Sequence, residues 1–178
     1  MSEVSENATV SLAVSYQALQ RLGRTTQEEF VLADLLVMGL FAVTAVEATV
    51  VRCLKNLGSA DEDIRKLIGL KTKYVAWKGR VNPTSVGTFD DEINALGEFR
   101  NSIAHGDADW KSISFSEVKL KRDESKKVIQ EIHEAHRNYN KSNNMKILRR
   151  ETTDASVINA RKHYQSELAK GGPPPTPR

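Results

Sequence analysis

The sequence predicts an all-α protein, an up-and-down bundle of four or more helices. Apolar residues recur at the helical period along several segments, and helix-capping signals stand between these segments. No alternation of apolar and polar residues is long enough to predict a strand convincingly. Because each such helix must bury its apolar face against another, a bundle is the expected architecture.

The longest predicted helix covers the apolar stretch from Phe30 to Leu57. Thr25-Thr26-Gln27-Glu28 before it is a capping-box pattern, and Gly58 after it suits a left-handed helix end. The middle of the stretch is apolar almost all round, so we expect other helices to surround it. Its longest uncharged part, residues 35–46, is shorter than the about 20 residues that span a bilayer, so we predict a buried core helix and no membrane partner.

Shorter helical segments are predicted downstream. Ser59-Ala60-Asp61-Glu62 is a second capping-box pattern, and it opens a helix that runs through Leu70. The helical period resumes from Phe89 to His105, where Gly106 ends it. The intervening residues 71–88 are compatible with one or two further helical turns followed by a loop.

Two conformations are open for residues 110–122. Ser114-Phe115-Ser116-Glu117 could cap a helix, or the segment could stay extended until Asp123. A polar-faced helix is predicted from Ser125 to about Asn140, and a last helix from Asp154 to Ala169.

The chain of 178 residues is long enough for one domain with a hydrophobic core. We expect a single helical domain over residues 10–170, between flexible termini at residues 1–9 and 171–178. The single cysteine, Cys53, excludes an intramolecular disulfide and a four-cysteine zinc site, which favours a reducing compartment. The polar, acidic start of the chain is unlike a secretory signal, so the predicted location is cytoplasmic.

The net charge of +3 hides a difference between two parts of the chain. Residues 1–107 carry 11 Lys and Arg against 14 Asp and Glu, a balance of −3, whereas residues 108–178 carry 15 against 9, a balance of +6. A basic face suits a polyanion such as RNA. A solvated helix surface explains the same residues equally well, because Asp123 and Glu124 interrupt the basic run that ends at Arg122.

The run Arg100-Asn101-Ser102-Ile103-Ala104-His105-Gly106 gathers the most chemistry in the fewest residues. An arginine binds phosphate bidentately, and a histidine moves protons near neutral pH. The helix dipole favours the imidazolium form at a helix C-terminus. These groups suffice for RNA cleavage with no metal and no other cofactor: His105 as acid and base, Arg100 stabilising the phosphate, and Asn101 in support.

The spacing places a geometric condition on this candidate catalytic site. In an ideal helix, five residues separate Arg100 from His105 by about 140° of rotation and about 7.5 Å of rise. The two side chains converge only if the helix unwinds near His105, which Gly106 permits, or if two copies face each other across a two-fold axis. The second arrangement predicts a homodimer and inactive monomers.

The run from Arg100 to Gly106 resembles the Arg-x₄₋₆-His motif of the HEPN superfamily, in which a polar residue often follows the arginine. Ala45-Val46-Glu47-Ala48 is similar to part of the second bundle helix of such domains. The resemblance covers residues 10–140 and implies a HEPN-like helical bundle, usually dimeric and often a metal-independent endoribonuclease. It implies Arg100 and His105 as catalytic residues with Asn101 supporting, and it makes Glu47 a candidate contact for Arg100.

The resemblance also implies partners. HEPN ribonucleases serve toxin–antitoxin, phage-defence or RNA-processing systems, so RNA, a second copy and an antitoxin or neighbouring-gene product are expected. A subgroup carries a tyrosine two residues after the histidine, which a partner nucleotidyltransferase modifies. Asp107 stands there in this chain, so that regulation is not implied. Because many HEPN domains do not cut RNA, the alternative is a non-catalytic module that binds a partner protein or RNA.

Other chemically suggestive residues have structural explanations. Asp90-Asp91-Glu92 resembles a metal cluster, but it stands at a predicted helix start, where the dipole favours carboxylates. His133, His136 and His163 have no ligand partner at a convincing spacing. We therefore predict no metal site, and we place these three histidines on the surface.

Overall fold

The computed structural model describes residues 3–22, 28–81, 89–105 and 113–148. They form helices and contain no strand, so the predicted all-α class is confirmed. The helices are α1 (Glu3–Leu22), α2 (Glu28–Asn56), α3 (Asp61–Lys66), α4 (Gly69–Val81), α5 (Asp90–His105) and α6 (Phe115–Ser142).

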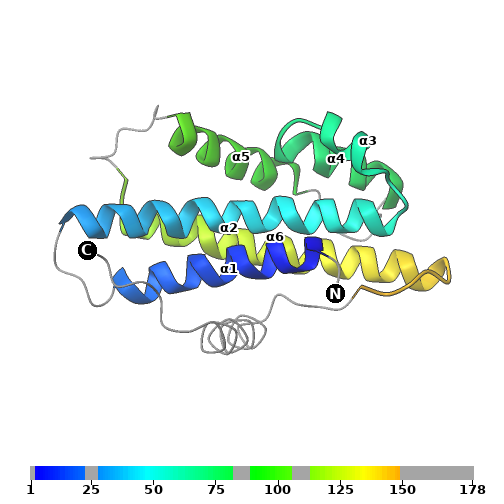
Figure 1. The fold of residues 1–178 in the computed structure, drawn as a ribbon, viewed down its shortest axis with the longest axis horizontal. Helices are drawn as coiled ribbons and strands as arrows, with labels where there is room; N and C mark the ends of the chain where they lie inside the picture. Colours follow the sequence, from blue (N-terminus) through cyan, green and yellow to red (C-terminus); the bar gives the residue numbers. More distant parts are fainter. Residues whose placement is uncertain (1–2, 23–27, 82–88, 106–112, 149–178) are drawn as a thin grey trace, which may run out of the picture.

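Helix α2 lies in the middle of the bundle (Figure 1). Helices α1 and α6 pack along one side of α2, and α3, α4 and α5 lie along the other side. The chain alternates in direction through α1, α2, α5 and α6, while α3 and α4 form a short excursion between α2 and α5. The predicted up-and-down helical bundle is thus confirmed at the level of architecture.

The bounds of α2, Glu28–Asn56, agree closely with the predicted Phe30 to Leu57. At its end Gly58 adopts a φ of +81°, and its N–H donates to the carbonyl of Lys55 at 3.0 Å. The N–H of Ser59 donates to the carbonyl of Leu54 at 3.1 Å, which completes a Schellman motif, so the predicted left-handed helix end is confirmed. The predicted capping box before α2 falls largely on residues 23–27, outside the described ranges.

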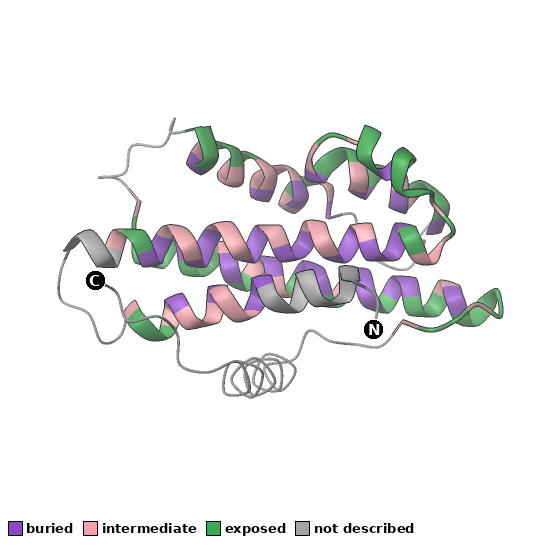
Figure 2. Cartoon of the chain, viewed as in Figure 1, coloured by how far each residue is buried: buried purple, intermediate pink, exposed green. Residues whose placement is uncertain are grey.

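The apolar character of α2 serves the core of the bundle. Figure 2 shows buried positions along nearly the whole helix, with partly exposed ones between them. By length and composition Leu32–Asn56 is the one stretch in the described ranges that could cross a membrane. In this fold 56% of its most apolar window is buried inside the protein, as the prediction of a core helix requires.

The second predicted capping box is wrong. The N-cap of α3 is Ala60, which forms no side-chain capping bond. The hydroxyl of Ser59 instead accepts a hydrogen bond from Nη1 of Arg80 at 2.6 Å, so a tertiary contact has replaced the local cap. The predicted helix through Leu70 also ends early, because Leu67 is extended and Gly69, with a φ of +81°, starts α4 in a new direction.

Helix α1 begins at Glu3, inside the segment predicted to be a flexible terminus. It packs on α2 through buried Leu12 and Ala18. Buried Ser15 adds a hydrogen bond from its hydroxyl to the carbonyl of Met38, at 2.7 Å. These contacts bury one face of α1 against α2, and such packing is the main source of helix stability in proteins.

Helix α6 settles the alternatives for the part of residues 110–122 that is described. Ser114 is its N-cap and accepts a hydrogen bond from the N–H of Glu117 at 3.2 Å. The helix then runs without interruption to Ser142, so the helical alternative is confirmed from Phe115 onwards. The predicted last helix, residues 154–169, lies outside the described residues.

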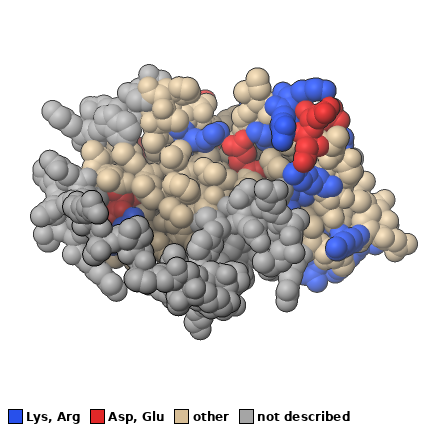
Figure 3. All heavy atoms as spheres, in the orientation of Figure 1, with Lys and Arg blue, Asp and Glu red and all other residues tan. Residues whose placement is uncertain are grey.

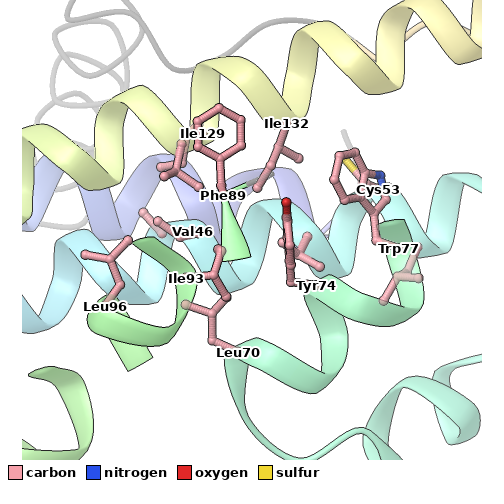
Figure 4. Packing of buried hydrophobic residues seen from close by; sticks show 14 of the residues in the cluster. Val46, Cys53, Leu70, Tyr74, Trp77, Phe89, Ile93, Leu96, Ile129 and Ile132 are labelled. Atoms are coloured by element: carbon pink, nitrogen blue, oxygen red, sulfur yellow. The ribbon is translucent and has the colours of Figure 1, made fainter. Parts of the chain in front are cut away.

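The main core lies between α2, α4, α5 and α6, where side chains from the four helices meet (Figure 4). Its labelled members are Val46, Cys53, Leu70, Tyr74, Trp77, Phe89, Ile93, Leu96, Ile129 and Ile132. Because this core fixes α4 and α5 against α2, it also determines which polar side chains of these three helices meet at the edge of the core.

The prediction that His133 and His136 lie on the surface is wrong. Only 7% of His133 and 1% of His136 is exposed. Both belong to the buried face of α6, whose residues recur every three or four positions and include Ile129 and Ile132. The charged residues of the opposite face lie between them in the sequence, so the buried pattern is difficult to recognise there. The third histidine, His163, falls outside the described residues.

Candidate functional site

The predicted site residues lie near the end of α5. Arg100 is one-third exposed, and both Asn101 and His105 are exposed. The helix continues through His105, so no unwinding occurs before this residue. A regular helix keeps Arg100 and His105 on different faces, and within one chain they do not converge.

The structure brings Arg100 together with Glu47 of α2. Nη1 of Arg100 lies 3.0 Å from Oε2 of Glu47, whose side chain is 17% exposed. Because α5 runs antiparallel to α2 (Figure 1) and helical side chains lean toward their own N-terminus, Arg100 points toward the later turns of α2. The predicted contact between these two residues is confirmed.

A second cation contacts the same carboxylate. The ammonium of Lys73, on α4, pairs with Oε1 of Glu47, and only 14% of the Lys73 side chain is exposed. The sequence prediction missed this residue because residues 71–88 had no clear pattern. Lys73 stands between buried Leu70 and Trp77 at helical spacing, and a lysine in such a stripe signals an acidic partner on a neighbouring helix.

Glu47, Lys73 and Arg100 form a cluster that we name the two-cation cluster. Each oxygen of the carboxylate faces a different cation, and the three groups together carry one net positive charge. Water screens this cluster less than a surface pair, because Glu47 and Lys73 are largely buried. The cluster can therefore attract an anion, and Arg100 is its most exposed cation.

Gly39 determines how closely α5 approaches α2. A Cβ added at Gly39 would lie 2.8 Å from the ring of Phe99 and 2.9 Å from Cγ1 of Val118. Phe99 immediately precedes Arg100, so the absence of a side chain at Gly39 lets α5 settle where Arg100 reaches Glu47. Glycine is thus required here for close packing rather than for a special backbone conformation.

The charges on α6 support the interpretation of a solvated helix surface. Lys119 lies 3.6 Å from Asp123, and Lys121 lies 2.9 Å from Glu124. Arg122 is buried, with its guanidinium carbon 5.8 Å from the centre of the Tyr16 ring. The basic run of α6 is therefore divided between local ion pairs and the core.

Mixed charges also occur around α3 and α4. Figure 3 shows basic side chains gathered on the right of the view with acidic side chains among them. Two ion pairs join separate elements here, Lys55 with Asp61 and Lys78 with Asp90, and Lys66 pairs with Asp63 within α3.

The acidic cluster Asp90-Asp91-Glu92 occupies the first turn of α5, as its structural explanation requires. Asp90 pairs with Lys78 of α4 at 2.5 Å, which ties the start of α5 to the preceding helix. Within the described ranges, no group of three His, Cys, Asp or Glu side chains is arranged to hold a metal ion.

The fold and this cluster define a helical-bundle protein in which a carboxylate of the central helix holds a partly exposed arginine. Comparisons of the chain with protein-family models, with curated proteins and with solved structures find no match.

Proposed function

We propose that this chain is a metal-independent endoribonuclease of HEPN type. The observation that carries the proposal is the ion pair between Glu47 and Arg100. It holds the arginine of the Arg-x₄-His motif from the neighbouring helix, through the residue named above as a candidate contact, and leaves one-third of the side chain exposed to a substrate. A guanidinium in this position is suited to binding a phosphate through two parallel hydrogen bonds.

The proposed reaction uses the 2′-hydroxyl of RNA as its nucleophile. His105 removes the proton from this hydroxyl, whose oxygen attacks the adjacent phosphorus. The bond from phosphorus to the 5′-oxygen breaks, and a protonated imidazole returns a proton to the leaving oxygen. Arg100 stabilises the charge that develops on the phosphate, and Asn101 supports its binding.

The proposed enzyme is a homodimer. His105 and Arg100 lie on different faces of one α5, so two copies of α5 across a two-fold axis would supply both groups to one cleft. Asn101 and His105 are both exposed on α5, which is compatible with this arrangement. A toxin–antitoxin or phage-defence setting, in the cytoplasm, belongs to the same proposal.

The test is cleavage of RNA by purified protein in EDTA. We expect Arg100→Ala and His105→Ala each to abolish cleavage without unfolding the protein, and Arg65→Ala, at an exposed arginine of α3, to leave it unchanged. Undiminished cleavage by both site variants would identify a contaminating nuclease and refute the proposal. A wild-type protein that binds RNA or a partner without cleaving RNA would establish the non-catalytic alternative.

A further inference from the structure

The two cations of the cluster differ in how they are held. Lys73 is 14% exposed and Arg100 is 34% exposed, so Lys73 is the inner and Arg100 the outer partner of Glu47. Nη1 of the guanidinium lies 3.0 Å from Oε2 of Glu47, whereas the ammonium of Lys73 pairs with Oε1. Each oxygen of Glu47 therefore serves one cation.

An arginine that meets a carboxylate with both oxygens accessible commonly closes a two-bond, fork-shaped pair. In this structure Lys73 pairs with Oε1, whereas Arg100 contacts Oε2. The ammonium also cancels the charge of Glu47, which weakens the attraction between the carboxylate and Arg100. Without Lys73, Glu47 and Arg100 would form a neutral pair with little capacity to attract an anion.

We propose that Lys73 is a positioning residue that keeps Arg100 available for phosphate, by occupying the second oxygen of Glu47. Lys73 itself does not touch the substrate, since its ammonium is turned inward to the carboxylate. The inference deepens the proposed function and rests on it for the identity of the anion, a phosphate of the RNA backbone. The geometry of the cluster supplies the rest of the argument.

The experiment measures how accessible Arg100 is to a reagent for free guanidinium groups. Wild type and variants are treated with phenylglyoxal, and modification of the peptide that contains Arg100 is followed by mass spectrometry. The variants are Lys73→Met, which removes the charge at similar length, and Lys73→Arg, which keeps it. Lys71→Met is the matched control, because Lys71 is an exposed lysine on the same helix.

We expect Lys73→Met to slow the modification of Arg100 at least about fivefold, the order expected for one additional partly exposed charge-assisted hydrogen bond. In Lys73→Arg and in Lys71→Met, Arg100 should be modified at the wild-type rate. In a Glu47→Gln background, Lys73→Met should have no effect, because the competing carboxylate is gone. A merely structural role of Lys73 would not produce this dependence on Glu47.

Equal labelling of Arg100 in wild type and Lys73→Met would overturn the inference, as would a slowing that persists without Glu47. If Lys73→Met does not fold, Lys73→Gln, neutral and polar, takes its place in the same comparison. The KM for RNA should rise in Lys73→Met and not in Lys71→Met. Wild-type protein that cleaves no RNA, while labelling still depends on Lys73, would refute the ribonuclease and leave the role of Lys73 intact.

Discussion

The indole N–H of Trp77 donates a hydrogen bond to Nδ1 of His136 across the contact between α4 and α6, over 3.3 Å. Nε2 of the same ring lies 2.8 Å from Oδ1 of Asn56, at the end of α2. Because Nδ1 accepts, the neutral ring carries its proton on Nε2 and donates it to Asn56. Three helices are thus joined through one imidazole, which must be neutral to make both bonds.

This relationship predicts a loss of stability in acid. Burial, with a smaller effect of the nearby Arg52, lowers the pKa of His136 from 6.5 to about 4. On acidification, the unfolded chain takes up a proton on this residue near pH 6.5 and the folded chain only near pH 4. The contribution of His136 to the free energy of unfolding is therefore complete above pH 6.5 and declines as the pH falls toward 4.

We expect His136→Gln, whose side-chain amide can still donate to Asn56, to reduce this decline. Thermal unfolding followed by circular dichroism should give a smaller drop in Tm between about pH 7 and about pH 5 than wild type shows. Carboxylates titrate in both proteins, so the difference between the two curves isolates His136. Parallel curves over this range would contradict the prediction.

The contact at Gly39 predicts that Gly39→Ala destabilises the bundle. The added methyl group would overlap the ring of Phe99, and the shift needed to relieve it should lower the free energy of unfolding by about 1–3 kcal/mol. Urea denaturation measures this change. RNA cleavage should fall as well, because a displacement of Phe99 also displaces the adjacent Arg100.

Gly97→Ala is the matched control for that prediction. Gly97 lies on α5, and a Cβ added there meets nothing within 4 Å. Because alanine is more stable than glycine in a helix interior by about 0.5–1 kcal/mol, this variant should be as stable as wild type or more so. Equal destabilisation by both variants would show that close packing at Gly39 is not the cause.

Glu47→Gln should affect both stability and activity. The variant leaves Lys73 and Arg100 near each other without their shared counter-charge, at an expected loss of about 1–3 kcal/mol in the free energy of unfolding. We expect RNA cleavage to decrease further than stability explains, because Arg100 loses its anchor. Glu98→Gln, at an exposed position of α5, should change neither urea denaturation nor cleavage. A Glu47→Gln protein as stable and active as wild type would exclude the anchoring role.

Mixing two inactive variants tests the proposed dimer. If Arg100 of one copy works with His105 of the other, a heterodimer of Arg100→Ala and His105→Ala retains one complete site. Random exchange of subunits should then restore about a quarter of wild-type cleavage. If the two residues act within one chain, the mixture stays as inactive as each variant alone, and the same assay reveals this.

The sequence predicts an element well where local signals and tertiary packing agree. Helix α2 agrees closely with prediction because its apolar stretch ends at Gly58, whose conformation and hydrogen bonds are local. The cap of α3 could not be predicted, because the hydroxyl of Ser59 is engaged by Arg80, 21 residues away. A distant donor that competes for a capping group leaves no trace in the pattern around the cap.

The candidate site likewise contains residues that the sequence predicts and one that depends on tertiary packing. Arg100, Asn101 and His105 stand in one run, and the resemblance makes Glu47 a candidate contact for Arg100. Lys73 could not be found by resemblance, and its place depends on how α4 packs against α2. The surface prediction for His136 is wrong for a related reason, since its neighbours in the sequence are charged while its neighbours in space are Trp77 and Asn56.

The two-cation cluster joins parts of the chain that are far apart in sequence. Lys73 follows Glu47 by 26 residues, and Arg100 is added only when α5 has docked on α2. A chain still being synthesised, or cut before α5, holds the carboxylate without its outer cation. Arg100 therefore takes its place only when α5 lies against α2, so a molecule in which these two helices are apart lacks the complete cluster.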